Sequence, residues 1–146
     1  QHPVQDAFRR MVFNVLSGNR DDHAKNHAFL MDKSGKWRLS PAYDLTPSDG
    51  PGGEHNMTIS GEGREPGPEH ITKIADDAGI PRKTAMSITQ HVAEAISSWR
   101  EYADRSGLNA AETSAIANRI ESHAKKAWLS GFPCGTNIIH DTAQHT

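Results

Sequence analysis

The sequence predicts a mainly α fold of the α+β class, a helical bundle that carries one small β-hairpin. Apolar residues recur at three- and four-residue spacing near the start of the chain and through most of residues 68–131. Two short segments rich in strand-forming residues flank a turn at residues 32–36. With 146 residues, of which 35% are hydrophobic, the chain has the length of one domain with a modest core.

Residues 3–17 are expected to form the first helix. Its apolar stripe consists of Val4, Phe8, Met11, Val12 and Val15. The opposite, polar face is expected to hold Arg10 and Asn14. Gly18 is a suitable C-terminal stop, and a polar loop over residues 19–26 follows.

The hairpin is expected next. Its strands are predicted within residues 27–31 and 37–39, because both segments are short, rich in apolar residues and separated by turn-forming Asp, Ser and Gly. Residues 46–68 then change composition abruptly, with six glycines and four prolines in that stretch. We therefore expect irregular structure there, with one short extended island at residues 57–59.

The remainder of the chain is expected to be helical, over residues 68–79, 82–105 and 109–131. The inward positions are Ile71, Ile74, Ala75, Ala78, Ala85, Ile88, Val92, Ile96, Trp99, Ala103, Ile116, Ile120, Ala124 and Trp128. Asn109 is predicted to cap the last helix, with the side chain of Glu112 reaching back to it. Residues 132–146 show no periodicity and are expected to form an irregular, flexible tail.

Charge and composition exclude several classes of function. The formal net charge is −2, so no field over the whole chain favours direct binding of nucleic acid. No apolar run is long enough for a membrane span. The single cysteine, Cys134, rules out an internal disulfide and fits a reducing, cytoplasmic setting, and no neighbouring base favours it as a nucleophile.

The most informative residues for function lie in the 19–26 loop. Asp21 and Asn26 are five residues apart with Lys25 between them, and Asp44 follows eighteen residues after Asn26. Phosphoryl transfer from ATP requires a carboxylate that orients or deprotonates the attacking hydroxyl, and oxygen ligands that hold Mg²⁺ against the phosphates. A kinase catalytic loop supplies an Asp and, five residues later, a metal-binding Asn, and a second Asp follows a β-hairpin. The order of these residues therefore predicts a kinase-type site.

The sequence around these positions, residues 19–26 and 39–45, resembles the HipA-type serine/threonine kinases, the toxin components of bacterial toxin–antitoxin pairs. In that family an Asp-x-His-x-Lys-Asn loop holds the catalytic Asp and a metal-binding Asn, and a later Tyr-Asp pair supplies a metal-binding Asp. The resemblance covers about residues 4–130 and includes the 55–61 stretch, but the two loop motifs are its specific part.

The resemblance implies that residues 1–131 form a kinase-like C-terminal lobe, with the 46–68 loop inside it. It implies a role for each matching residue: Asp21 as catalytic base, Lys25 in a supporting catalytic role, His23 in shaping the loop, Asn26 and Asp44 as Mg²⁺ ligands, and Tyr43 beside those two at the ATP.

The resemblance also implies partners. Family members place the lobe that clamps ATP before this region, so we expect Mg²⁺ and ATP to bind only together with that N-terminal lobe and expect little kinase activity from this chain alone. On this reading the chain is one domain of a longer protein. The further partners implied are a HipB-like helix-turn-helix antitoxin and a protein substrate, with aminoacyl-tRNA synthetases as known targets of the family.

Two other interpretations remain open from the sequence. The chain could be a non-catalytic interaction module that binds an antitoxin-like partner or a separate N-lobe chain. It could also be a metal-dependent phosphohydrolase built on Asp21, His23, His27 and Asp44. The second carboxylate of the loop, Asp22, is expected to be solvated or to cap the loop, and His27 is expected to lie in a strand.

Overall fold

The computed structural model describes the backbone of residues 2–128 and the side chains of residues 2–124. Five α-helices and one two-stranded antiparallel sheet occur in this part of the chain, so the predicted mainly α fold with one hairpin is confirmed. The predicted tail at 132–146, Cys134 and the side chain of Trp128 lie outside the described residues. No helix among the described residues is long and apolar enough to cross a membrane.

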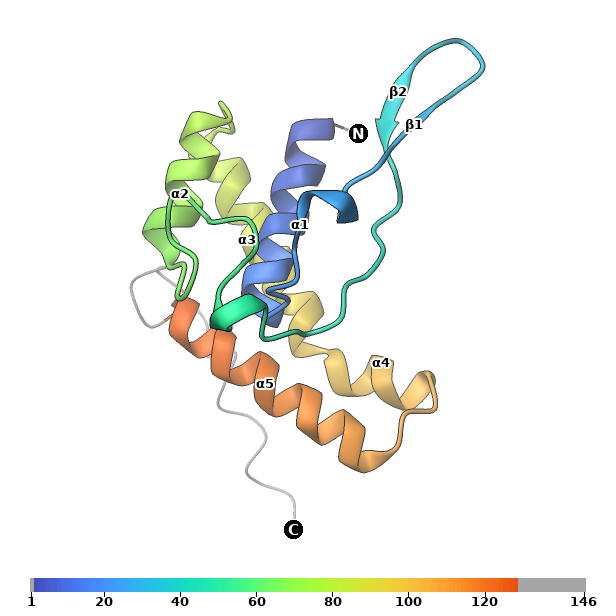
Figure 1. Cartoon of the computed structure of the whole chain (residues 1–146), viewed down its shortest axis with the longest axis vertical. Helices are drawn as coiled ribbons and strands as arrows, with labels where there is room; N and C mark the ends of the chain where they lie inside the picture. The colour runs from blue at the N-terminus through green and yellow to red at the C-terminus, as the bar shows by residue number, and fades with distance from the viewer. Residues whose placement is uncertain (1, 129–146) are drawn as a thin grey trace.

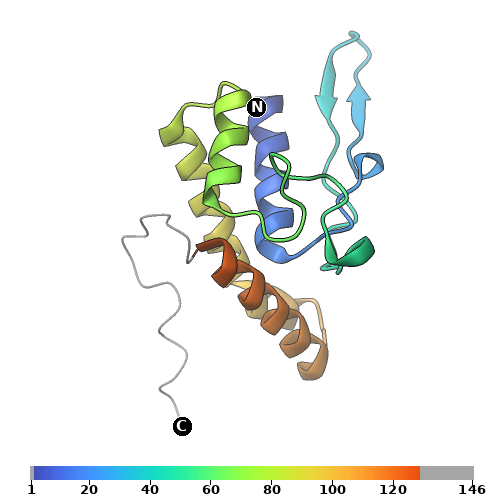
Figure 2. The same cartoon turned by 60° about the vertical axis from the view of Figure 1, so that its left-hand side comes forward.

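Helix α1 (Pro3–Ser17) lies at the centre of the molecule and packs against α2, α3, α5 and strand β2 (Figures 1 and 2). It ends at Gly18, whose φ of 70° is left-handed. A Cβ on this glycine would also lie 2.6 Å from Nδ1 of His123 on α5. Both the backbone conformation and the close approach of α5 therefore require glycine at the end of α1.

The central position of α1 corrects two predictions about its faces. Asn14, expected on the polar face, is buried together with Leu16 and Ser17, because neighbouring elements surround the last turn of the helix on every side. Val4, expected in the apolar stripe, is 42% exposed at the first turn, where fewer neighbours cover the helix.

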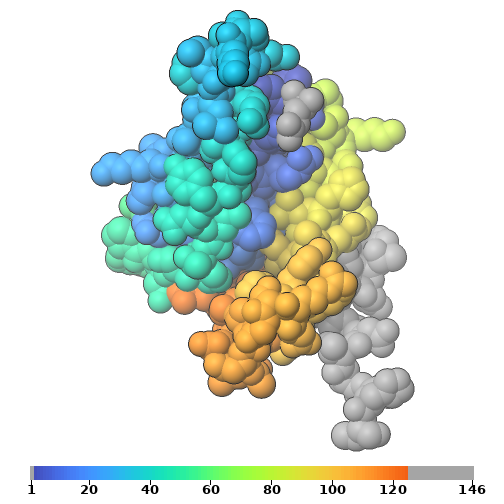
Figure 3. Space-filling view, turned by 90° about the vertical axis from the view of Figure 1, so that its right-hand side faces the viewer, coloured from blue at the N-terminus to red at the C-terminus, as the bar shows by residue number. Residues whose placement is uncertain are grey.

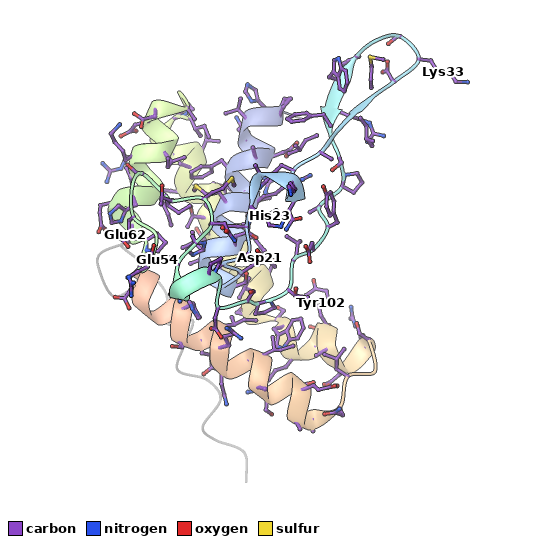
Figure 4. The ribbon with its side chains drawn as sticks, viewed as in Figure 1. Asp21, His23, Lys33, Glu54, Glu62 and Tyr102 are labelled. Carbon is purple, nitrogen blue, oxygen red and sulfur yellow. The ribbon has the colours of Figure 1, made fainter. Side chains whose placement is uncertain are left out.

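The hairpin consists of β1 (Phe29–Met31) and β2 (Trp37–Leu39), and it projects from the body of the molecule with Lys33 at its tip (Figures 3 and 4). The carboxylate of Asp32 accepts hydrogen bonds from the backbone N–H groups of Ser34 and Lys36 and from the Ser34 hydroxyl. These bonds, above all that of the hydroxyl, lower the pKa of Asp32. His27 was expected in a strand. It instead caps the C-terminal end of η1 (Ala24–Asn26), a short 3₁₀ turn before β1.

The helices that follow are α2 (Pro68–Asp77), α3 (Arg82–Ser97), α4 (Trp99–Arg105) and α5 (Ala110–Trp128). The single helix predicted over residues 82–105 is wrong, because the chain breaks at Ser98 between α3 and α4. The hydroxyls of Ser97 and Ser98 both donate to the carbonyl of Glu94, which offers the backbone an alternative to helical bonding there.

The core is continuous from α1 through α2, α3 and α5. At the end of α2, Ala78 is exposed rather than inward, and the buried residue is Ile80 after the turn. At the start of α5 the predicted cap is confirmed: the Glu112 N–H donates to Oδ1 of Asn109 at 2.9 Å, and the Asn109 N–H donates to the Glu112 carboxylate at 3.4 Å.

The segment between the hairpin and α2 is irregular, as predicted, apart from the short 3₁₀ turn η2 (Pro51–Gly53) and two isolated bridges. One bridge joins Asn19 to Ser48, and the other joins Ile59 to Glu62. Ile59 is 3% exposed and belongs to the core. The segment is therefore fixed both to the end of α1 and to the helices.

Candidate active site

The 19–26 loop begins where Gly18 turns the chain out of α1. Backbone hydrogen bonds hold its start: the Asn19 N–H donates to the Asn14 carbonyl at 2.9 Å, and the Arg20 N–H donates to the Ser48 carbonyl at 3.0 Å. The loop ends in η1, where the Asn26 N–H donates to the His23 carbonyl at 2.9 Å. Each side chain of the loop is thus carried on a backbone fixed at both ends.

The structure brings Asp21, Asn26 and Asp44 together, as the order of these residues in the sequence indicates. The Asn26 amide Nδ2 donates to the backbone carbonyl of Asp21 at 3.1 Å and to Oδ2 of Asp44 at 3.1 Å. The side chain of Asp21 is 50% exposed, and that of Asp44 is also open to solvent. The Asn26 carboxamide therefore joins the backbone of Asp21 to the carboxylate of Asp44 at the base of the hairpin, where the side chains of both aspartates are accessible to solvent.

Hydrogen bonds to its own backbone and from the neighbouring Tyr43 fix the position of Asp44. Its φ of 55° lies in the left-handed region, which Asp tolerates better than most residues. The Asn19 Nδ2 donates to its backbone carbonyl at 3.3 Å. The neighbouring Tyr43 hydroxyl donates to the Lys25 carbonyl at 2.7 Å, which ties the segment after the hairpin to η1.

His23 lies on the same loop as Asp21 (Figure 4), and Lys25 follows two residues later in the chain. Lys25 is exposed, so its ammonium group is free to reach a bound anion. The His23 Nε2 lies 4.0 Å from Oδ1 of Asp21, and its Nδ1 is buried with no hydrogen-bond partner among the described residues.

Asp22 lies in a different environment from the one expected of it. Its side chain is 2% exposed, not solvated, and its Oδ2 lies 2.8 Å from Nδ1 of His55, which is itself 1% exposed. Its Oδ1 accepts from the Met57 N–H at 3.2 Å. Because carboxylate oxygens accept hydrogen bonds, Nδ1 of His55 is assigned as the donor in this contact.

A second buried polar pair lies under the loop. Asn19, 2% exposed, donates from Nδ2 to Oδ1 of Asn14 at 3.1 Å, in addition to its bond to the Asp44 carbonyl. The sequence signal that could have identified these residues is weak: an Asn near the end of an apolar helix, an Asp beside the expected base, and a His in a Gly- and Pro-rich stretch.

Directly after the same loop, His27 is partly buried, and this burial lowers its pKa, with the Arg10 guanidinium lowering it further. Its Nε2 is buried with no partner among the described residues. The Arg10 guanidinium donates to the carbonyl of Ser40 and so links α1 to the end of β2.

Among the described residues there is no group of three or more His, Cys, Asp or Glu side chains that could hold a metal. The four residues of the alternative phosphohydrolase interpretation, Asp21, His23, His27 and Asp44, do not form such a group. The Asp44 carboxylate and the Asn26 carboxamide, whose nitrogen donates to that carboxylate, each carry an oxygen of the hard type that Mg²⁺ prefers, an ion usually held by one or two protein groups together with phosphates and water.

Fold and site together define a mainly α lobe that presents two aspartates and an asparagine beside a small hairpin. Residues 1–128 match the sequence model of the family described as HipA-like C-terminal domain. The chain therefore belongs to this family.

A curated relative is the serine/threonine-protein kinase toxin HipA of Shewanella oneidensis, which is 44% identical over 45 residues. The match covers 31% of this chain and 10% of the length of that relative. No solved structure matches the chain.

Proposed function

We propose that this chain is the catalytic lobe of a HipA-like protein serine/threonine kinase. The observation that carries the proposal is the convergence of Asp21, Asn26 and Asp44, with the Asn26 amide 3.1 Å from the Asp44 carboxylate. Catalysis of phosphoryl transfer is mainly positioning and charge neutralisation, and it needs this combination of a carboxylate base and oxygen ligands.

In the proposed site, Asp21 accepts a hydrogen bond from the substrate hydroxyl and takes its proton as the hydroxyl oxygen bonds to the γ-phosphorus of ATP, while the bond from that phosphorus to the β,γ-bridging oxygen breaks and ADP leaves. The amide oxygen of Asn26 and the carboxylate of Asp44 would hold Mg²⁺, and the ion would neutralise phosphate charge on ATP. The exposed Lys25 adds positive charge on the same side of the loop. Tyr43 keeps Asp44 and η1 in register through its bond to the Lys25 carbonyl.

We further propose that activity requires an N-terminal kinase lobe, since none of the described elements is a β-sheet large enough to clamp a nucleotide. The relative named above is a serine/threonine-protein kinase toxin of which the match covers a tenth, which supports a larger functional unit. The family resemblance extends the proposal to a HipB-like helix-turn-helix antitoxin as a partner and to a protein substrate such as an aminoacyl-tRNA synthetase.

Transfer of labelled phosphate from Mg-ATP to protein tests the proposal. The chain is assayed alone, with the N-terminal lobe of a HipA-type kinase added in trans, and joined to that lobe in one polypeptide. We expect transfer only with the lobe present, and expect Asp21→Asn and Asp44→Asn each to abolish it. Robust transfer in the combined protein that is unaffected by Asp21→Asn would contradict the proposed base.

The second candidate, a non-catalytic interaction module, is favoured by one observation. Phe29, Met31 and Trp37 on the hairpin are 57%, 58% and 61% exposed, and Met31 and Trp37 are paired across the two strands. Such an apolar face is typical of a surface that another protein covers. In the assay above, tight binding of the N-terminal lobe without phosphate transfer would support the module and reject the kinase.

A further inference from the structure

The loop over residues 54–64 lies directly against the 19–26 loop, and the two are joined at several points. The Asn56 N–H donates to the Arg20 carbonyl at 3.0 Å, and the Arg20 guanidinium donates to the Arg64 carbonyl at 2.7 Å. Figure 4 shows Asp21 on the neighbouring loop, with Glu54 and Glu62 marking the 54–64 loop beside it. These contacts place a second segment, distant in sequence, next to the proposed base.

One of these contacts reaches the reacting carboxylate itself. The Asn56 Nδ2 donates to Oδ1 of Asp21 at 2.9 Å and also lies 3.3 Å from the Arg20 carbonyl. Among the described residues, no hydrogen bond is made to Oδ2 of Asp21. The carboxylate thus has one oxygen held by the protein and one oxygen open, in a side chain that is half exposed.

The buried pair of Asp22 and His55 fixes the residues on either side of this contact. Asp22 follows Asp21 in the chain, and His55 precedes Asn56. Their side chains meet at 2.8 Å and are almost completely buried, and Asp22 also accepts from the Met57 N–H. Each member of the Asp21–Asn56 contact is therefore next to a residue that cannot move without breaking a buried charge-assisted hydrogen bond.

The 54–64 loop is itself closed and anchored. The His55 N–H donates to the Gly63 carbonyl at 2.7 Å, and Ile59 packs into the core. Glu62 accepts from the N–H groups of Arg64 and Glu65, which lower its pKa, the Glu65 bond contributing most. The backbone that carries Asn56 is therefore fixed by hydrogen bonds and by packing against the core.

We propose that Asn56 is a positioning residue for the proposed catalytic base, and that the buried Asp22–His55 pair anchors it. By holding Oδ1, Asn56 fixes the rotation of the Asp21 carboxylate and directs Oδ2 toward the substrate hydroxyl. The proposal rests on the proposed kinase function. It adds a requirement for residues outside the loop motifs that carry the family resemblance.

The test uses the chain combined with an N-terminal kinase lobe and compares Asn56→Ala with Gln90→Ala, a control that removes an exposed amide bonded to Glu94 on α3. We expect Asn56→Ala to lower kcat by about 10- to 100-fold while KM for ATP changes less than about twofold, since orientation rather than binding is lost. Gln90→Ala should match the wild type. An unchanged kcat for Asn56→Ala, or a loss confined to KM, would overturn the proposal.

The anchor is tested by a pair of substitutions at His55. The amide nitrogen of Asn can occupy the place of Nδ1, whereas the longer Gln places its amide near Nε2. We expect His55→Asn to keep most of the activity and His55→Gln to lose it, with both variants compared at a temperature where circular dichroism shows them folded. Equal activity of the two variants would contradict the anchoring role.

A readout independent of activity separates this inference from the kinase proposal. We expect amide hydrogen exchange of residues 19–26 in the chain alone to become faster in Asn56→Ala and to stay unchanged in Gln90→Ala. Unchanged exchange in Asn56→Ala rejects the positioning role whether or not the combined protein is a kinase. Faster exchange in a combined protein without Asp21-dependent transfer would support the contact and reject the kinase function alone.

Discussion

Asp21 and Asp22 are adjacent carboxylates in one loop, and they lie in opposite environments. The side chain of Asp21 is half exposed and makes one hydrogen bond, to an exposed amide. The side chain of Asp22 is 2% exposed and is bound by an imidazole and a backbone N–H. Consecutive residues in an extended loop point to opposite sides, so one side of the loop is available for chemistry while the other is used to fix it.

The same division holds for the neighbouring residues. The outer set, Asp21, Asn26, Tyr43 and Asp44, lies at the surface, and the inner set, Asn14, Asn19, Asp22 and His55, is buried. Both sets contain Asn and Asp, and both contact Asp44, the inner set at its backbone carbonyl and the outer set at its carboxylate. Burial, rather than residue type, therefore separates the side chains that hold the loop from those that stay accessible to a ligand.

The largest expected effect is at Asp22. Asp22→Ala leaves both Nδ1 of His55 and the Met57 N–H without their acceptor, and each buried donor left unpaired in this way costs about 1–3 kcal/mol of the free energy of unfolding. The matched change Asp21→Ala is expected to alter that free energy by less than about 0.5 kcal/mol. Urea unfolding followed by circular dichroism measures both, and similar losses in the two variants would show that the loop has no stabilising inner side.

A smaller difference is expected between the two asparagines that contact Asp44. Asn19→Ala leaves the buried Oδ1 of Asn14 unpaired, which costs about 1–3 kcal/mol. Asn26→Ala removes hydrogen bonds that water can replace and is expected to cost less than about 1 kcal/mol. The contrast would be rejected if Asn26→Ala proved the more destabilising of the two in the same unfolding experiment.

Much of the fold could be predicted from the sequence because its signals are local. The periodicity of α1, the turn residues of the hairpin and the Asn109–Glu112 cap each depend on residues within a few positions of one another. The break at Ser98 was not predicted because the apolar stripe runs on across it, with Ile96 and Ala103 both buried. There, side-chain competition for the Glu94 carbonyl outweighs the periodic pattern.

The residues of the candidate site likewise fall into those that a local sequence pattern predicts and those that it does not. Asp21, Asn26 and Asp44 could be found because a motif with fixed spacing places them on either side of a hairpin. His55 and Asn56 could not, since their partners lie 33 and 35 residues away and no local pattern connects a Gly- and Pro-rich stretch to the loop after α1. Asn14 was assigned to the wrong face because its burial depends on the loop and on α5 covering the last turn of α1.

Within the outer set, Tyr43 provides a finer test of the comparison. Tyr43→Phe removes the bond from its hydroxyl to the Lys25 carbonyl, which is exposed, and we expect a cost of at most about 1 kcal/mol. Tyr102→Phe is the control, since Tyr102 is 52% exposed on α4. If Tyr43→Phe lowered the free energy of unfolding as much as Asn19→Ala does, Tyr43 would belong with the inner, stabilising residues.

The smallest effect concerns the pH dependence of stability, through His27 directly after the loop. Burial, aided by Arg10 and His23 and opposed by Asp22, holds the pKa of His27 below the ordinary histidine value of about 6.5. Above that value the ring is neutral in both the folded and the unfolded chain, so it does not affect stability. Below it the unfolded chain binds a proton that the folded chain resists, and stability falls until the pH reaches the lowered pKa.

We therefore expect the thermal midpoint of the wild type to decline between pH 7 and pH 5 more steeply than that of His27→Gln, which has no titrating ring. The difference between the two curves isolates His27 because the other titratable groups are common to both. Identical slopes would show that the ring is solvated in solution. In that case burial on the inner side of the loop would not extend to His27. The comparison between the two sides would then apply to residues 19–26 alone.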